Sequence, residues 1–315
     1  MGDPAGIAPE ITVGAWRALR ESGPAFFVIA DPATLPVHLP IHLIDHPSVT
    51  GFGHALPVLP LRLAAPALPG SPDFAHAPAI IESIRIATNL AHRHLARGMV
   101  TNPITKTTLT QSRIFHNGHT GFIAELLGVA GEEVMMLACP HLRVVPVTVH
   151  VALREAVAQL STAAIVATAI TTHESLIQDF GIKAPRLAIA GLNPHAGENG
   201  LMGREEIEII EPAMAILRAG GVRVSGPHPP DTLFTPSARQ NYDAAICMYH
   251  DQALIPLKTL DRDGGVNVTL GLPIVRTSPD HGTAFDIAGK NIANPASLIS
   301  AIKLADQIAT QRGSP

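Results

Sequence analysis

Short apolar runs alternate with helix-length amphipathic segments through most of this 315-residue chain, and that alternation constrains its fold more than any other feature. Strands that alternate with helices form βαβ units, in which neighbouring strands run parallel. We therefore predict an α/β fold of mostly parallel sheets flanked by helices. The expected strands are 25–30, 134–138, 144–149, 186–190 and 244–248, and the expected helices are 8–22, 78–97, 153–179, 204–219 and 295–311.

The length favours one large α/β domain or two interlocked ones. Residues 31–78 carry ten of the 28 prolines, which indicates irregular edge strands and loops and not a separate domain. We predict one part built from 1–115 plus 275–315, on the cofactor side. The other part, 116–274, would hold the metal and substrate residues and the dimer contact.

Composition excludes several classes of protein. Hydrophobic residues make up 46% and charged residues 15%, enough for a large core and too apolar for a disordered chain. A net charge of −4 without basic runs argues against nucleic acid, and no apolar stretch has membrane-spanning length. The low charge also predicts a homodimer, because a second copy would cover apolar surface. Cys139 and Cys247 lie in apolar strand-like runs, which indicates buried free thiols and a cytoplasmic location.

The start of the chain is unusual. Its glycine-rich turn, GDPAGIAPE, begins at residue 2, although such a turn normally follows a strand. We hypothesise that the true first strand is missing or that Met1 is an internal start. The mass of the intact native protein would decide.

Three of the sixteen histidines lie at or just past the carboxyl end of a predicted strand. His150 ends VVPVTVH, His195 follows RLAIAG in the turn LNPH, and His250 ends AAICMYH. Ligands bind at this edge of parallel sheets, and three imidazoles with an open fourth position suit a catalytic divalent cation. Each histidine alone also fits a strand cap bonded to backbone, and their wide spacing does not by itself require a metal.

Anion-binding side chains gather after the third histidine. Lys258 follows LIPLK, interpreted as a strand, Asn267 lies in GGVNVTLG, and Arg276 follows PIV. Such donors hold phosphate or carboxylate groups. Upstream, GHTGF places His119 and Thr120 at a helix start, where backbone amides favour anions. A solvated lysine and a plain helix cap are the competing interpretations.

Four common enzyme signatures are missing from the sequence. Neither G-x-G-x-x-G after a strand nor G-x-x-x-x-G-K-[ST] occurs, so a Rossmann or P-loop site has no support. G-x-S-x-G and cysteine-nucleophile arrangements are also missing, which argues against acyl-enzyme chemistry.

Taken together, these motifs resemble one family over nearly the whole chain. GDPAGIAPE, TNPITK, FHNGHT, His150, GLNPHAGENGLMGREE, YHDQ and GVNVTLGLPIVRTSPDHGTAFDIAG occur in the order found in 4-hydroxythreonine-4-phosphate dehydrogenases of pyridoxal phosphate biosynthesis. The stretch HGTAFDIAGKNIANP is similar to the adenine-pocket segment of isocitrate and isopropylmalate dehydrogenases. The resemblance implies their non-Rossmann fold with two interlocked domains.

The resemblance also implies roles for particular residues and a homodimer whose subunits share the active site. The metal ligands would be His150, His195 and His250. The substrate contacts would be His119, Thr120, Lys258, Asn267 and Arg276. The cofactor contacts would be His281, Gly282, Thr283 and Ala284, with Asp286 near the ribose. The chain departs from the family at Gly121, where members have an acidic residue, at Ala8, where they have glycine, and in lacking a strand before the glycine turn.

The predicted reaction is NAD- or NADP-dependent oxidation of 4-phosphohydroxy-L-threonine to the 3-oxo acid, which decarboxylates to 3-amino-2-oxopropyl phosphate. A divalent cation (zinc, magnesium, manganese or cobalt) would assist both steps. The general base is unassigned, and Asp251 and Lys106 are candidates that also fit a salt bridge or strand-end cap. Gly121 leaves open another phosphorylated hydroxy acid, such as a four-carbon sugar-acid phosphate. A zinc hydrolase or a non-catalytic metal-binding protein would leave HGTAFDIAGK unexplained.

Overall fold

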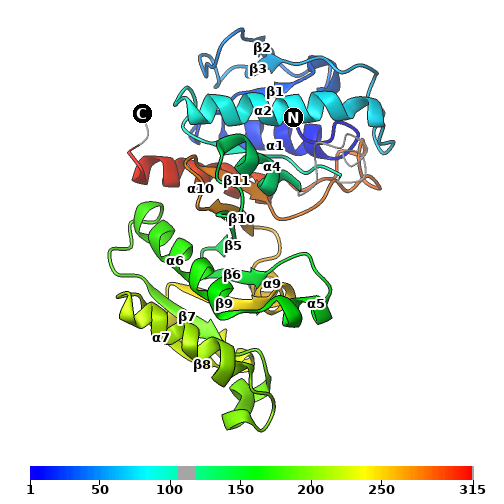
Figure 1. The fold of residues 1–315 in the computed structure, drawn as a ribbon. Helices are drawn as coiled ribbons and strands as arrows, with labels where there is room; N and C mark the ends of the chain where they lie inside the picture. The colour runs from blue at the N-terminus through cyan, green and yellow to red at the C-terminus, as the bar shows by residue number, and fades with distance from the viewer. Residues whose placement is uncertain (106–117, 314–315) are drawn as a thin grey trace. The chain divides into compact units, whose positions relative to one another are not determined.

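The computed structural model describes residues 1–105 and 118–313, and it divides into two compact units (Figure 1). Unit 1 is Met1–Glu133 with Leu272–Pro315, and unit 2 is Val134–Gly271. This division differs from the predicted one because α4 (Gly118–Leu127) packs against α2 (Ala77–His92) and so belongs to unit 1. Lys106, one candidate base, lies outside the described residues.

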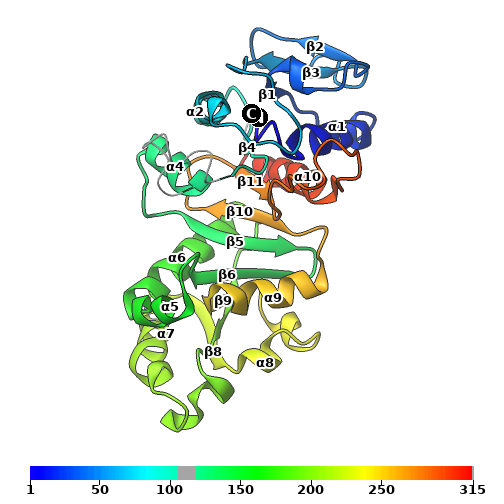
Figure 2. The same cartoon turned by 90° about the vertical axis from the view of Figure 1, so that its right-hand side faces the viewer.

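Unit 1 contains two sets of parallel strands and four α-helices among its described residues. One set has the order β1-β3-β2, made of β1 (Val28–Ala30), β3 (Leu56–Pro60) and β2 (Ile41–Leu43). The other pairs β4 (Met99–Val100) with β11 (Arg276–Pro279). The remaining helices are α1 (Ala8–Leu19) and α10 (Ala296–Gln311). In Figure 2, α1 and α2 lie on opposite sides of β1.

Two separate apolar clusters hold unit 1 together. One is formed by α1, β3 and α10 around Trp16, whose indole Nε1 donates to the carbonyl of Phe52 at 2.8 Å. The other is formed by α2, β4 and α4 around Ile80 and Ile123, both fully buried. Each helix faces its cluster with residues at helical spacing, so burial of these side chains supplies most of the driving force.

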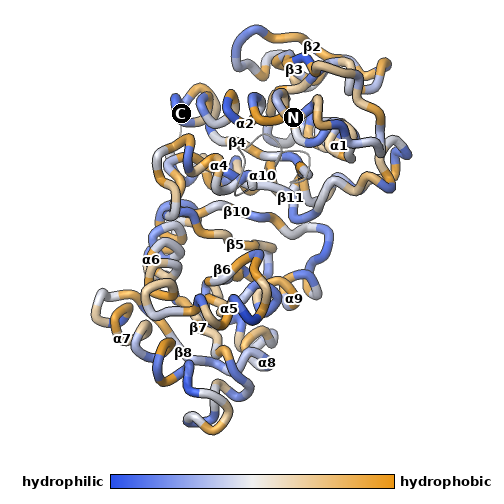
Figure 3. The backbone as a smooth tube through the Cα atoms, turned by 45° about the vertical axis from the view of Figure 1, so that its right-hand side comes forward, coloured by the Kyte–Doolittle hydropathy of each residue, from blue (hydrophilic) through white to orange (hydrophobic). Residues whose placement is uncertain are grey.

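Unit 2 contributes six neighbouring strands to one sheet, in the order β10-β5-β6-β9-β7-β8. The strands β6, β9, β7 and β8 run parallel, whereas β5 is antiparallel to both β10 and β6. Figure 2 shows α6 and α7 on one face and α9 on the other, and Figure 3 shows hydrophobic residues along β5, β6 and β9. The bounds are β5 (Val134–Cys139), β6 (Leu142–Thr148), α5 (Leu153–Gln159), α6 (Thr162–Gln178), β7 (Arg186–Ala190), α7 (Glu211–Ala219), β8 (Arg223–His228), α8 (Pro230–Leu233), β9 (Ala244–Tyr249), α9 (His250–Leu260) and β10 (Val266–Leu270).

Most expected elements are present, and two expectations are corrected. The helix expected over 153–179 is two helices that meet at 91°, because Ser161 begins a new helix by accepting a hydrogen bond from the amide of Ala164. The strand expected over LIPLK is wrong: these residues belong to α9, whose Ala253, Leu254 and Leu257 are buried at helical spacing.

The thiols and the hydropathy agree with the sequence analysis. Cys139 and Cys247 are both free and buried, as predicted. Within the described residues, no single helix combines the length and hydropathy of a membrane span, and only α5 and α6 taken as a pair reach them.

Candidate functional site

The three predicted metal ligands follow three neighbouring strands of unit 2. The strand β9 lies between β6 and β7, and all three run parallel, so their carboxyl ends share one edge of the sheet. His150 lies just past β6, His250 begins α9 directly after β9, and His195 lies in the turn after β7. The sequence prediction that these histidines sit at strand ends is confirmed for all three.

Two of the three imidazoles already lie side by side. The ring centroids of His150 and His250 are 5.5 Å apart, with an angle of 46° between the ring planes. The His250 Nδ1 is 3.1 Å from the Asp251 Oδ1, so a proton on Nδ1 would be shared with that carboxylate. The other ring nitrogen, Nε2, would then carry the lone pair that a metal ion needs.

The backbone at His150 and His195 is strained. Both residues have positive φ, 51° and 52°, and the strained stretch at His195 continues through Asn199. Left-handed conformations are uncommon for residues with a Cβ and persist where the surrounding structure enforces them, often at functional sites.

A buried carboxylate, which the sequence analysis did not single out, enforces the turn at His195. Glu206 is 2% exposed and its Oε1 accepts hydrogen bonds from the amides of Leu192 and Asn193, each at 2.8 Å. A Cβ at Gly197 would lie 2.5 Å from its other oxygen, so this glycine permits the close approach. Glu206 therefore positions His195 without touching it. Only its place in GLNPHAGENGLMGREE pointed to it.

A buried glutamine joins the ends of β9 and β7. The Gln252 Oε1 accepts from the amide of Met248 at 2.6 Å, and its Nε2 donates to the carbonyl of Gly191 at 2.8 Å. These two bonds fix the start of α9, and with it His250, against the segment that leads to His195.

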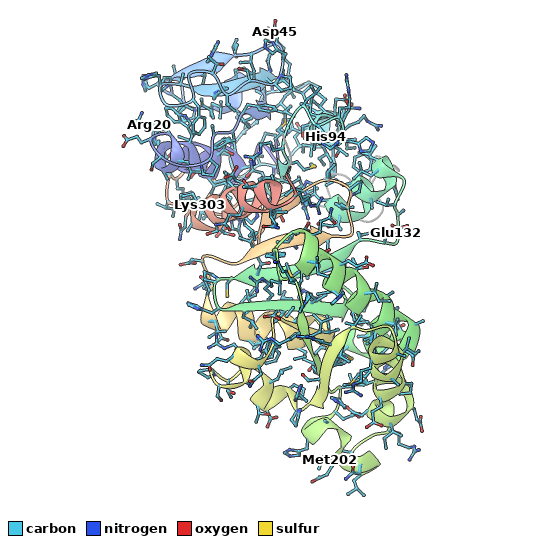
Figure 4. All side chains as sticks on the ribbon, turned by 90° about the vertical axis from the view of Figure 1, so that its left-hand side faces the viewer. Arg20, Asp45, His94, Glu132, Met202 and Lys303 are labelled. Carbon is cyan, nitrogen blue, oxygen red and sulfur yellow. The ribbon has the colours of Figure 1, made fainter. Side chains whose placement is uncertain are left out.

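The complete histidine triad is not assembled. Across residues 1–105 and 118–313, no group of three or more His, Cys, Asp or Glu side chains is arranged to hold a metal ion. The His150–His250 pair is formed, whereas His195 lies on an exposed turn. This turn leads to the exposed Leu201 and Met202, of which Met202 is labelled in Figure 4. Neutral imidazoles at one sheet edge suit a divalent transition metal, so the donor set fits even though the triad is open.

A separate group of anion-binding side chains lines a hollow of about 180 Å³ in unit 1. Arg276, the first residue of β11, is 3% exposed and donates from Nη2 to the Thr101 Oγ1 at 2.7 Å. Its Nη1 is 3.4 Å from the Thr120 Oγ1, and His119 lines the same hollow. The sequence prediction placed His119, Thr120 and Arg276 in one site, and the structure brings these three together.

Burial lowers the pKa values of two side chains in this hollow. Burial lowers the pKa of Arg276 to about 10, so the guanidinium stays charged at neutral pH. Burial, together with the positive charges of Arg276 and the chain's α-amino group, holds the pKa of His119 well below its usual 6.5. Among the described residues, the hollow therefore brings together the guanidinium of Arg276, the neutral imidazole of His119 and the hydroxyl of Thr120, which is a set suited to an anion.

The other two predicted substrate contacts belong to unit 2. Lys258 is exposed on α9 and does not follow a strand, which corrects the sequence interpretation. Asn267 lies in β10 opposite Leu137, and its Oδ1 has no hydrogen-bond partner within the described part of the chain. Their role in binding substrate stays a prediction.

The predicted cofactor segment packs against the glycine turn at the start of the chain. The carbonyl of Thr283 accepts from the amide of Ile7 at 3.0 Å, and a Cβ at Gly6 would lie 2.7 Å from that carbonyl. His281 and Gly282 line the anion hollow, while Ala284 has a φ of 43°. Asp286 is exposed.

The fold and these side chains define a class: a two-unit α/β enzyme with strand-end histidines in one unit and an arginine-based anion site in the other. The chain belongs to the family described as pyridoxal phosphate biosynthetic protein PdxA, whose model matches residues 24–305. The family resemblance predicted from the motifs is thus confirmed.

Several relatives match over nearly the whole chain. The 4-hydroxythreonine-4-phosphate dehydrogenase of Caulobacter vibrioides is 52% identical over 322 residues, covering 99% of this chain and 97% of the relative. That of Methylorubrum populi is 51% identical over 324 residues, covering 98% and 93%. The crystal structure of the Klebsiella pneumoniae enzyme superposes with a TM-score of 0.88 at 39% identity and covers 98% of both chains. These likenesses confirm the mixed α/β fold class.

Proposed function

We propose that this chain oxidises 4-phosphohydroxy-L-threonine with NAD or NADP to the 3-oxo acid, which decarboxylates to 3-amino-2-oxopropyl phosphate. The observation that carries the proposal is the charged, buried Arg276 beside Thr120 and His119, in a chain 52% identical to a dehydrogenase named for a phosphorylated substrate.

The anion hollow of unit 1 is proposed to bind the phosphate. A guanidinium with five donors matches phosphate oxygens, and the hydroxyl of Thr120 adds a donor. His119 is neutral near pH 7 because of its lowered pKa, so it donates one hydrogen bond without adding a second full charge. Arg276 is anchored by Thr101, so little side-chain entropy is lost when the ligand binds.

The strand-end histidines of unit 2 are proposed to hold the divalent cation. Such an ion, when bound, supplies Lewis-acid assistance to alcohol oxidation and to decarboxylation of the keto acid. Asp251 would orient the His250 ring through Nδ1, and Glu206 would hold the turn that carries His195. Asp251 thereby acts as a positioning residue in this proposal, and it stays a candidate for the general base.

The segment from His281 to Asp286 is proposed to contact the nicotinamide cofactor. The support is that His281 and Gly282 line the hollow where the phosphate is proposed to bind, so this segment borders the anion site. The homodimer and the cytoplasmic location are likewise proposals, the second supported by two free, buried thiols.

The decisive experiment is an anaerobic assay with 4-phosphohydroxy-L-threonine, NAD or NADP, and a series of divalent metals, followed by NADH absorbance. His195→Ala should abolish activity and bound metal while the circular dichroism spectrum stays native. His141→Ala removes an exposed histidine outside the proposed site and is the matched control. Full metal content in His195→Ala would count against the histidine site, and no NADH with any metal would count against the function.

A further inference from the structure

The turn that carries His195 has a backbone conformation that residues with a Cβ disfavour. Its five residues, His195 to Asn199, all have positive φ, between 44° and 76°, and only Gly197 among them lacks a Cβ. Left-handed residues normally occur singly, because each one brings its Cβ too close to the following carbonyl oxygen. Five in succession therefore depend on contacts from outside the turn.

The side chain of Asn193 supplies such contacts from two residues before His195. Its Nδ2 donates to the Glu205 Oε2 at 2.7 Å and to the Glu206 Oε2 at 2.9 Å. An amide nitrogen carries two hydrogens and ionised carboxylates only accept, so each carboxylate receives one hydrogen. The main chain of Asn193 extends the connection into the turn, because its carbonyl accepts from the amide of Ala196 at 3.1 Å.

A glycine leaves the space that this arrangement needs. A Cβ at Gly203 would lie 2.7 Å from both the Asn193 Cγ and the Glu205 Oε2. Real Cβ atoms do not approach other atoms so closely, so a side chain at position 203 would displace the amide or the carboxylate. The φ of Gly203 is 124°, which other residues rarely adopt. The backbone at 203–206 is therefore shaped around the side chain of Asn193.

The bridge requires an amide at position 193. Glu205 and Glu206 share one nitrogen as their donor, so two negative charges lie close to each other. The two amide hydrogens offset the repulsion, and the bond from Asn193 is the largest cause that lowers the pKa of Glu205. An aspartate here would have the same shape, but it would donate no hydrogen bond and would add a third negative charge.

We propose that Asn193 is a positioning residue of the histidine site. By joining Glu205 to Glu206 it fixes the left-handed turn, and the fixed turn sets the affinity of the site for its divalent cation. This inference rests on the proposed role of the three strand-end histidines as metal ligands. Asn193 acts through His195, in the way that residues which orient a metal ligand raise its affinity for the ion.

The test is a titration of the metal-free protein with Co²⁺ alone, followed by calorimetry and by the visible absorption of the bound ion. Asn193→Asp should weaken Co²⁺ binding by roughly 10- to 100-fold. The absorption of the ion that still binds should resemble that of His195→Ala. Asn199→Asp is the matched control, because it makes the same change at an exposed position of the same turn, and it should not weaken Co²⁺ binding.

A second variant covers the case in which Asn193→Asp does not fold, as judged by circular dichroism. Glu205→Ala removes one of the two acceptors at a half-buried position and should weaken Co²⁺ binding severalfold. Its control is Glu211→Ala, at an exposed position in the first turn of α7.

Native Co²⁺ affinity in a folded Asn193→Asp protein, or an equal loss in Asn199→Asp, would overturn the proposal. If Asn193→Asp does not fold, native affinity in Glu205→Ala would overturn it. A loss of Co²⁺ in His195→Ala alone would leave the histidine site standing and remove only the role of Asn193. A native protein that binds no Co²⁺, or a His195→Ala protein that keeps its full affinity, would overturn both the histidine site and this inference.

Discussion

The buried guanidinium of Arg276 supplies the positive charge of the anion hollow. Arg276 remains charged at 3% exposure because its guanidinium is hydrogen-bonded, including to Thr101, and its pKa stays near 10. A buried charge of this kind is costly for folding and gains its full compensation from a bound anion. Arg276 therefore contributes to anion binding more than to the stability of the fold.

The first prediction concerns that cation. Arg276→Ala should raise KM for the phosphorylated substrate by roughly 10- to 100-fold, the loss expected when one charge-assisted partner of a phosphate is removed. KM for the nicotinamide cofactor should change much less. Steady-state kinetics with each substrate varied in turn provides the measurement, and Arg62→Ala, an exposed arginine of unit 1, is the control. An unchanged KM would remove Arg276 from the substrate site.

The second prediction concerns His119 and pH. Its pKa is lowered in the folded protein, so below about pH 6.5 the unfolded chain takes up a proton that the folded chain does not. Stability should therefore fall as pH decreases from about 6.5 toward the lower folded pKa. His119→Gln should flatten this dependence in urea unfolding between pH 7 and 5, while His141→Gln should leave it unchanged. An identical pH dependence in His119→Gln would show that the pKa of this imidazole is not lowered in the folded protein.

At the residue scale, the sequence predicted the positions that depend on strand ends and missed those that depend on distant acceptors. His150 and His250 could be placed because each ends an apolar run, and neighbouring parallel strands bring such ends together. Glu206 could not, because nothing local indicates that a carboxylate will accept amides from a turn thirteen or fourteen residues upstream.

At the scale of elements, periodicity predicted five of the described strands and most of the long helices, but it failed where two patterns coincide. LIPL is an apolar run that suits a strand, yet in α9 it places Leu254 and Leu257 on one buried face. The bend between α5 and α6 depends on the side-chain cap at Ser161, which a continuous helical period conceals. Neither the edge strand β8 nor β10 was expected, since both contain glycine, proline or polar residues beside their apolar ones.

The third prediction belongs to the contact between the glycine turn and the cofactor segment. Gly6→Ala would place a Cβ 2.7 Å from the carbonyl of Thr283, which is backbone and must shift. We expect the substitution to cost about 1–3 kcal/mol of folding free energy and therefore to lower the Tm by several degrees. Relative to the native enzyme, KM for NAD should rise more than KM for the phosphorylated substrate. Calorimetry and kinetics measure the two effects. Gly53→Ala, whose new Cβ would meet only one atom at 3.4 Å, should change neither. A native Tm and native KM values for Gly6→Ala would show that the cofactor segment, His281 to Asp286, does not depend on its contact with the glycine turn.

At the scale of the whole molecule, the apolar composition of the chain is reflected in aliphatic side chains that are exposed on two helices of unit 2. Only 15% of residues are charged, and α6 exposes Ile170 and Ile177, which are 39% and 41% accessible. They lie seven positions apart on one helix face, and Val157 of α5 is exposed as well, at 39%. Exposed aliphatic residues on one helix face are typical of protein contact surfaces. We therefore interpret α5 and α6 as the part of the chain that a second copy covers.

The fourth prediction tests that interpretation. Light scattering at micromolar concentration should give twice the 33.1 kDa of one chain. The double substitution Ile170→Glu with Ile177→Glu should reduce the mass to that of one chain. The reason is that burying two carboxylates against a partner costs more free energy than the contact contributes to association. Leu43→Glu, at a 56% exposed position in β2 of unit 1, should stay dimeric. The family resemblance implies an active site built from both subunits, so the monomeric variant should also lose dehydrogenase activity. A native chain that is monomeric at this concentration would contradict the interpretation, and a fully active monomer would show that each subunit carries a complete site.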